Sequence, residues 1–131
     1  MPDEKREIAL MQMQRAQELL REVPVLIEVS AYNSAVNRAY YAAFHAMKAL
    51  EAMEGFDSRK HSGAISHFRQ CYIKTGVLPA ELSKIIELLQ IARGDSDYNV
   101  SVKFTSEEAA MQLDNAKRFV SAVERFLEMQ T

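Results

Sequence analysis

The chain has no tryptophan, one cysteine, four glycines and three prolines among its 131 residues. With Cys71 alone, no disulfide can form within the chain, and a reducing compartment is the setting that this composition favours. The scarcity of glycine and proline, together with 48% hydrophobic and 26% charged residues, excludes a disordered chain and indicates a helical globule. A chain of this length buries roughly two thirds of its unfolded surface, so we expect one domain over residues 1–131.

Long apolar runs are absent as well. No stretch approaches the roughly 18 uncharged apolar residues of a membrane span, and residues 1–6 lead into a run of mixed charge. We therefore expect a cytoplasmic protein with no membrane contact. The sixteen basic and eighteen acidic residues give a net charge of −2, which argues against binding of long duplexes by bulk electrostatics. Any contact with nucleic acid must be local.

Apolar residues recur at helical spacing in five segments. The predicted helices cover residues 3–22, 31–54 and 61–74, a fourth segment that carries Pro79 in its first turn, and a last one from about 106 to 129. We expect Pro24 to end or kink the first helix, Gly55 to stop the second, and the small and acidic residues over 93–99 to interrupt the fourth. No segment has the pattern of a strand. These features predict an all-α, antiparallel up-and-down bundle of about five helices.

The second helix is predicted to be the central one. Its inward-facing stripe is Tyr32, Val36, Tyr40, Ala43, Met47 and Leu50. Alanines at positions 35, 39, 42, 46 and 49 widen this stripe with small side chains, which lets a neighbouring helix approach closely.

Metal and cofactor chemistry finds little support in the sequence. His61 and His67 are six residues apart, which does not stack them on one helical face, so we expect no metal site and no cofactor. Residues 95–99 imitate the first half of a calcium loop, but the sixth position is Val100 in place of glycine. Cys71 has aromatic and aliphatic neighbours, which is typical of a small core residue and not of a nucleophile.

The polar residues of the second helix form a possible site. Arg38 and His45 are seven residues, or two helical turns, apart, with Tyr41 between them on the same stripe. One interpretation makes this stripe the solvated or dimer-facing side of an apolar helix. The other assigns phosphate binding to Arg38 and proton transfer to His45, the two roles that a metal-free ribonuclease needs.

Two further groups of charge are candidates for binding. Arg59-Lys60-His61 precedes the third helix, where free backbone N–H groups can add to an anion site, although a solvated loop is the simpler interpretation. Arg93 lies four residues before Asp97, a spacing that also suits an ordinary surface ion pair near a helix end.

Four segments, taken in order, resemble the HEPN domain: Ala35 to Ala46 (AVNRAYYAAFHA), His61-Ser62-Gly63, Thr75 to Pro79 (TGVLP), and Arg93 with Asp97-Tyr98. The resemblance runs from about Ala9 to Leu127. It implies a helical bundle that forms a homodimer and is often encoded beside a minimal nucleotidyltransferase, as a toxin and antitoxin pair. Many HEPN proteins are metal-independent ribonucleases, and others bind nucleotides or serve as partner proteins.

The ribonuclease motif of this family is an arginine followed, after four to six residues, by a histidine. At the equivalent place this chain has Arg93 and then Tyr98, and no histidine follows His67. A phenol with a reference pKa near 10 is a poor general base at pH 7. Arg38 and His45 fit the letter of the motif with six intervening residues, but they lie mid-helix, where the family shows a packing and dimer signature.

The sequence therefore supports two functional hypotheses. The first is a homodimeric HEPN protein that binds nucleotide or RNA, pairs with a nucleotidyltransferase and has little catalysis of its own. Its binding residues are predicted to be Tyr41, His61, Arg93 and Tyr98, and the resemblance also implies Tyr98 as an acceptor of a transferred nucleotide. The alternative is a ribonuclease toxin that uses Arg38 and His45 where they meet Arg93 and Tyr98, across a two-fold axis. A helical scaffold without a ligand is a third hypothesis.

Overall fold

The computed structural model describes residues 3–130. Its helices are α1 (Glu4–Glu28), α2 (Tyr32–Glu54), α3 (His61–Phe68), α4 (Glu81–Tyr98) and α5 (Ser106–Met129), and a π-helical segment, η1 (Arg69–Ile73), continues α3. No strand occurs within these residues, so the predicted all-α fold and its five helices are confirmed. Positions 1, 2 and 131 of the predicted domain lie outside the described residues.

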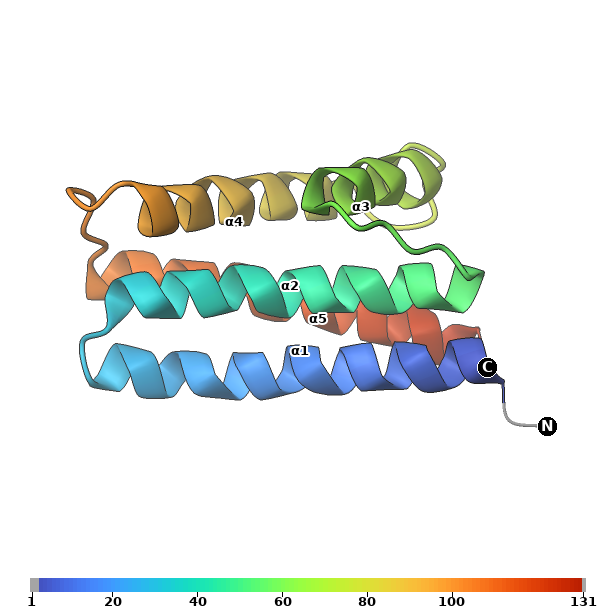
Figure 1. Cartoon of the computed structure of the whole chain (residues 1–131), viewed down its shortest axis with the longest axis horizontal. Helices are drawn as coiled ribbons and strands as arrows, with labels where there is room; N and C mark the ends of the chain where they lie inside the picture. Colours follow the sequence, from blue (N-terminus) through green and yellow to red (C-terminus); the bar gives the residue numbers. More distant parts are fainter. Residues whose placement is uncertain (1–2, 131) are drawn as a thin grey trace.

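The four long helices alternate in direction along the chain (Figure 1). Helix α1 lies along one side of α2, and the layer of α3 and α4 lies along the other side. Helix α2 contacts each of the other four α-helices, which confirms its predicted central place. None of the helices between residues 3 and 130 combines the length and the apolar character needed to cross a bilayer.

Small side chains let α2 occupy this position. The alanines at 35, 39, 42, 46 and 49 have no exposed surface, and helices α1 and α5 pack against α2. This stripe is therefore covered within one protomer and leaves no free surface for a second copy. Of the predicted inward-facing residues of α2, only Tyr32 is half-buried, because it is the first residue of the helix. The largest fully buried side chains include Tyr40, Phe68 and Phe119, each of which contributes on the order of 2–3 kcal/mol through burial.

Pro24 was predicted to end or kink the first helix, and the predicted end is wrong, because α1 continues through Pro24 to Glu28. Pro24 lies on the exposed side of the helix, where its ring meets solvent and the carbonyl that loses its helical partner can bond to water. Val23 is fully buried and Leu26 packs against the core, so tertiary contacts hold the last turn together.

The predicted interruption of the fourth helix over residues 93–99 is also wrong, because α4 stays helical to Tyr98. Side-chain contacts hold the final turns: Arg93 pairs with Asp97 one turn further on, and the Ser96 hydroxyl donates to the Asn33 carbonyl of α2. At its other end, α4 begins at Glu81, two residues after Pro79. Pro79 therefore precedes the first turn and is not part of it.

Other helix ends follow their sequence signals. Gly55 ends α2 with φ of 77°, a left-handed conformation that glycine adopts without strain. Thr105 caps α5 through a reciprocal pair of hydrogen bonds with Glu108, which satisfies two free backbone N–H groups.

Cys71, predicted to lie in the core, is only half-buried in η1, with Sγ 3.7 Å from Nδ1 of His67.

Candidate functional site

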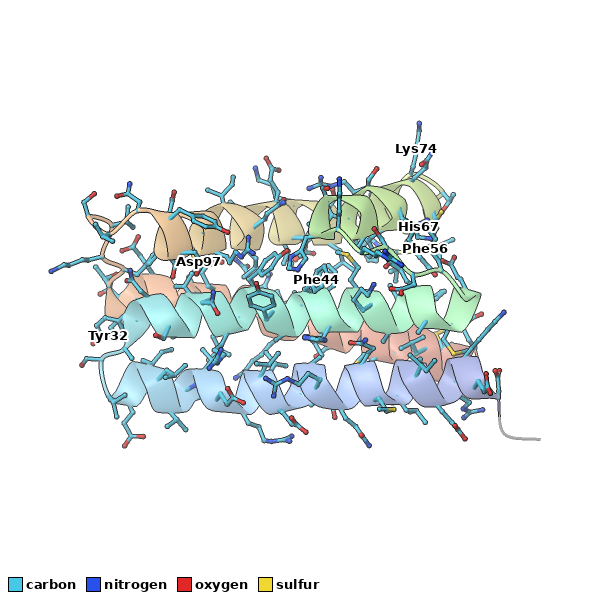
Figure 2. All side chains as sticks on the ribbon, viewed as in Figure 1. Tyr32, Phe44, Phe56, His67, Lys74 and Asp97 are labelled. Carbon is cyan, nitrogen blue, oxygen red and sulfur yellow. The ribbon has the colours of Figure 1, made fainter. Side chains whose placement is uncertain are left out.

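Three helices bring aromatic side chains around one arginine. We call this group the Arg93 cluster; it consists of Tyr40, Tyr41, Phe44, His61, Arg93, Asp97 and Tyr98. Helix α2 supplies the first three residues, α3 supplies its first residue, and the final turns of α4 supply the rest. Figure 2 shows Phe44 between α2 and the α3–α4 layer, with Asp97 further along the same interface.

The Arg93 guanidinium lies among three tyrosine rings. Its central carbon is 5.1 Å from the ring centroid of Tyr40, 5.5 Å from that of Tyr41 and 6.0 Å from that of Tyr98, within the range of cation–π attraction. Nη2 donates to the Tyr41 hydroxyl at 3.1 Å, and this hydrogen bond is the main reason that the pKa of Arg93 rises above its ordinary value. Arg93 is thus a permanent cation whose side chain is 19% exposed.

Asp97 neutralises part of that charge. Its Oδ2 lies 3.2 Å from Nε of Arg93, without the alignment of a hydrogen bond, and its Oδ1 accepts from the Asn37 amide at 2.8 Å. Since the Asp97 side chain is itself partly exposed, an anionic ligand can compete with it for the guanidinium. The site therefore has a cation that a phosphate could reach after a modest rearrangement.

Tyr40 and His61 form the buried wall of the cluster. The Tyr40 hydroxyl is 2.9 Å from Nδ1 of His61, and the His61 ring stacks on Phe44 with centroids 4.0 Å apart. Burial raises the pKa of Tyr40 to about 12, so its phenol stays protonated. Burial and the nearby Arg93 charge lower the pKa of His61, which keeps the imidazole neutral at pH 7.

Tyr98 forms the open edge. Its side chain is 79% exposed although its ring lies beside the Arg93 guanidinium. An exposed ring next to a cation is a surface on which a nucleobase can stack while its phosphate meets the charge.

The structure places the two predicted catalytic residues apart from this cluster. Arg38 is exposed and forms an ion pair with Glu22 of α1, with Nε 3.0 Å from Oε1. His45 also contacts α1, through a 2.7 Å hydrogen bond between Nδ1 and the Gln12 side-chain oxygen. Neither residue forms a hydrogen bond or ion pair with Arg93 among residues 3–130. The predicted stripe is thus divided, because Tyr41 contacts α4 whereas its two neighbours on the stripe contact α1.

His45 nevertheless has properties of a proton acceptor. Burial, with smaller effects from Arg15, His61 and Lys48, lowers its pKa, so the ring is neutral at pH 7. When Nδ1 donates its proton to Gln12, the lone pair of Nε2 is free.

A polar hollow connects Arg38 with the edge of the cluster. Its volume is about 310 Å³, and it is lined by Asn33, Ser34, Asn37, Arg38, Ser96 and Asp97. Amides and hydroxyls of this kind suit hydrogen bonding to a sugar or base edge. Arg38 therefore borders the site even though it makes no contact with Arg93.

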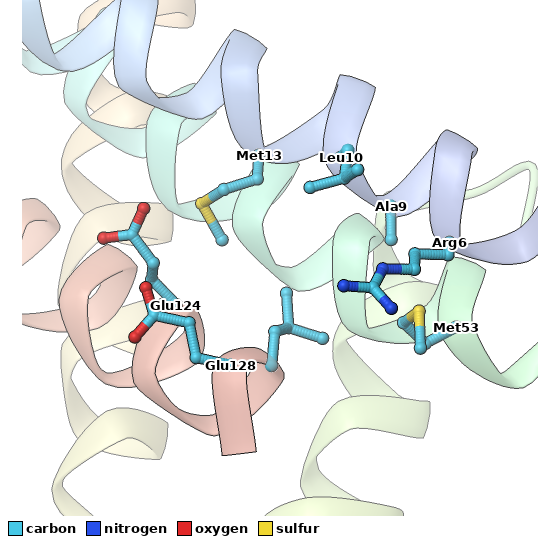
Figure 3. A pocket seen from close by; sticks show the side chains of 8 residues that line it. Arg6, Ala9, Leu10, Met13, Met53, Glu124 and Glu128 are labelled. Atoms are coloured by element: carbon cyan, nitrogen blue, oxygen red, sulfur yellow. The ribbon is translucent and has the colours of Figure 1, made fainter. Parts of the chain in front are cut away.

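A largely apolar hollow lies elsewhere, between α1, α5 and the end of α2 (Figure 3). Its volume is about 180 Å³, and it is lined by Arg6, Ala9, Leu10, Met13, Met53, Glu124, Leu127 and Glu128. It shares no residue with the Arg93 cluster. Within the described part of the chain, no three histidine, cysteine or acidic side chains converge as metal ligands.

Sequence reasoning missed two members of the cluster. Tyr40 was assigned to the core stripe, and it is fully buried, yet its ring also faces Arg93. Phe44 was identified only as part of the segment that resembles the HEPN domain, although His61 stacks on its ring. The spacing of four between them was the available signal, since it places both rings on one face toward α3 and α4.

Comparison with known proteins agrees with this architecture. A family model described as the HEPN domain matches residues 9–126. A UPF0332 protein of Thermotoga maritima is 33% identical over 126 residues, which cover 96% of each chain. Two proteins of Methanocaldococcus jannaschii, whose names provisionally call them toxins, are 34% and 30% identical over 113 and 123 residues. These matches cover 86% and 94% of this chain, and 84% and 83% of the relatives.

Proposed function

Because this chain belongs to the HEPN domain family, we propose that it binds a nucleotide or RNA at the Arg93 cluster and acts within a toxin–antitoxin-type pair. The observation that carries the proposal is the Arg93 guanidinium, held among three tyrosine rings beside the exposed Tyr98. In this role, Arg93 binds a phosphate, Tyr98 stacks on a base, and neutral His61 supplies a hydrogen bond. Tyr41 positions the guanidinium.

The cluster supports binding better than strong catalysis. At the position after Arg93 where the family motif requires histidine, the chain has Tyr98, whose phenol is a poor base at neutral pH. His61 is close to Arg93, but its Nδ1 already pairs with Tyr40 and its ring is packed on Phe44. We therefore propose that this protein has little ribonuclease activity of its own.

The partner proposed for this protein is a minimal nucleotidyltransferase, and a second copy of the chain completes the assembly. The exposed face of α4 supports a protein contact beside the site, because Leu88, Ile91 and Tyr98 lie on one side of this helix with 39%, 56% and 79% exposure. Such a partner could also transfer a nucleotide to the Tyr98 hydroxyl. Mass spectrometry of the protein after incubation with the partner and ATP tests this: an unmodified Tyr98 would remove the transfer proposal.

A ribonuclease that uses Arg38 and His45 is the second candidate function. The neutral, half-buried His45 imidazole is the observation that favours it, since a free Nε2 can accept a proton. The observation against this candidate is that Arg38 pairs with Glu22, whereas His45 contacts Gln12. The two residues share no contact that would direct both toward one ligand.

An RNA cleavage assay separates the two functions. Wild-type, Arg38→Ala and His45→Ala proteins are incubated with RNA in EDTA, and circular dichroism checks that each is folded. Our proposal predicts binding without rapid cleavage by any of the three. Cleavage by the wild type that both substitutions abolish, with the fold intact, would establish the ribonuclease instead. Co-expression with the neighbouring reading frame tests the partner, and a nucleotidyltransferase that fails to co-purify would count against it.

A further inference from the structure

A long stretch of the chain contains no acidic residue. Between Asp57 and Glu81 there is neither aspartate nor glutamate, whereas Arg59, Lys60, Arg69 and Lys74 all lie there. All 18 acidic residues and 12 of the 16 basic ones lie outside this stretch. The protein is therefore acidic overall but carries one basic segment, which folds as the loop before α3, α3 itself and η1. Such segregation creates a local positive potential that the net charge of −2 conceals.

The basic segment borders a groove. The groove lies between the α3–η1 segment and α4, has a volume of about 580 Å³, and is lined by Ser62, Ile65, Ser66, Arg69, Gln70, Ile73, Lys74 and Gln90. Both of its charged side chains are cations, and no carboxylate lines it. We call it the basic groove. It shares no residue with the Arg93 cluster.

The two cations of the groove are available to a ligand. Nε of Arg69 donates to the Ser83 hydroxyl at 3.1 Å, which fixes the guanidinium against α4. Among residues 3–130, neither Arg69 nor Lys74 forms an ion pair. Lys74 extends away from the bundle at the end of this layer (Figure 2). Arg69 is thus a positioned cation, and Lys74 a mobile one that can follow its ligand.

The chemistry of the groove favours a peptide over a nucleic acid. Single strands of nucleic acid need exposed aromatic rings on which bases stack, and a longer track of cations. Here Phe68 and Tyr72 are buried, and the ring of His67 stacks on Phe56 at 3.8 Å. The serine and glutamine side chains can instead exchange hydrogen bonds with a peptide backbone, and Ile73 offers an apolar contact for an aliphatic side chain.

We propose that the basic groove binds an acidic peptide segment of a partner protein. About 14 residues of helix separate Lys60 from Lys74, which corresponds to roughly 20 Å, or about six residues of extended peptide. A fitting segment carries carboxylates at both ends, for the Arg59–Lys60 pair and the Arg69–Lys74 pair, with aliphatic residues between them. This surface goes beyond the proposed function, which concerns the Arg93 cluster.

Fluorescence anisotropy tests the proposal with a labelled octapeptide that has two glutamates at each end and alanine and leucine between them. The matched variants are Lys74→Glu in the groove and Lys117→Glu on α5; both lysines are exposed and both substitutions change the net charge equally. We expect Lys74→Glu to weaken binding about tenfold and Lys117→Glu less than about twofold, because charge reversal acts mainly on nearby carboxylates.

Three results would overturn the proposal. The first is no saturable binding of the peptide to the wild type, and the second is equal loss of affinity in the two variants. The third is tighter binding of an oligouridylate of eight nucleotides with the same dependence on Lys74, which would make the groove a nucleic-acid surface. Since the Arg93 cluster is unchanged in both variants, these outcomes are independent of the proposed function.

Discussion

At the scale of single residues, the surroundings of a charge decide what it can do. Arg93 keeps its charge in a half-buried place because Tyr41 and Asp97 satisfy part of the guanidinium and the tyrosine rings attract the rest. Arg38, by contrast, is exposed and paired with Glu22. The same side chain therefore forms a candidate binding site on α4 and an ordinary surface ion pair on α2, which is worth little stability.

Glu51 is a buried carboxyl group whose ionisation opposes folding. It has no exposed surface, neither oxygen has a hydrogen bond among the described residues, and its closest cation, Nζ of Lys48, is 3.9 Å away. Burial raises the pKa of Glu51 from 4.5 to about 7. The unfolded chain therefore releases the Glu51 proton at lower pH than the folded protein does. As a result, the free energy of unfolding falls as pH rises from about 4.5 to 7.

Replacing Glu51 with methionine should remove the loss of stability that occurs as pH rises. We expect Glu51→Met to raise the free energy of unfolding by about 1–3 kcal/mol at pH 8 and by clearly less at pH 5, because the carboxyl group is neutral in the folded protein at the lower pH. Urea denaturation at the two pH values measures the difference, with the exposed Glu28→Met as the control. An equal change in stability at pH 5 and pH 8 would contradict this account of Glu51.

At the scale of elements, two glycines offer the same substitution with opposite expected signs. Gly94 lies inside α4, and a Cβ added there meets nothing within 4 Å. Gly76 has equal space, but its φ is 78°, a conformation that costs an alanine about 1–2 kcal/mol. We expect Gly94→Ala to stabilise the protein by about 0.5–1 kcal/mol and Gly76→Ala to destabilise it by about 1 kcal/mol.

Denaturant midpoints of the two alanine variants check this pair of predictions. Because neither added methyl group meets a neighbouring atom, packing cannot account for the expected difference in sign. Two shifts of the same sign would show that backbone conformation does not control stability at these positions.

Helix positions could be predicted from the sequence, but not every helix end could. The apolar periodicity located all five helices, and Gly55 and Thr105 marked their boundaries correctly. Pro24 failed as a stop signal because Val23 is buried in the core and holds the final turn of α1. The end of α4 was missed because its last turns depend on contacts with α2, and local sequence does not reveal which distant helix will lie alongside.

The candidate site, like the helix ends, could be predicted only in part from the sequence. Tyr41, His61, Arg93 and Tyr98 were expected to bind the ligand, and the structure brings these four together. Helical spacing also placed Arg38 and His45 on the stripe of Tyr41. Helical spacing predicts which residues share a face of α2, but it does not predict which neighbouring helix each of these residues contacts.

At the scale of the whole molecule, the resemblance to HEPN domains implies a homodimer, and the structure limits where the interface of such a dimer can be. The alanine stripe of α2 is covered within the protomer, so it cannot form the interface. The face of α4 with Leu88 and Ile91 remains open, beside Tyr98. We therefore expect self-association through α4, which would place two Arg93 clusters near the two-fold axis.

Sedimentation equilibrium tests this assembly. The account predicts a mass near twice the 14.9 kDa of the chain, and a monomer for Ile91→Glu, because a buried charge at the interface is costly. Ile8→Glu, on the exposed side of α1, is the control and should stay dimeric. A wild-type protein that remains monomeric at high concentration would contradict the dimer.

The central claim is that Arg93 is the anchor of a ligand site. The most direct measurement is calorimetric titration of a short single-stranded RNA into the wild type, Arg93→Ala, Arg93→Lys and the control Arg125→Ala, in EDTA and at fixed salt. We expect saturable binding to the wild type and the control, and a loss of about tenfold or more in Arg93→Ala, the cost of one charge-assisted contact. Arg93→Lys should recover only part of that loss, because lysine lacks the planar fork. Wild-type affinity in a folded Arg93→Ala protein would contradict the claim.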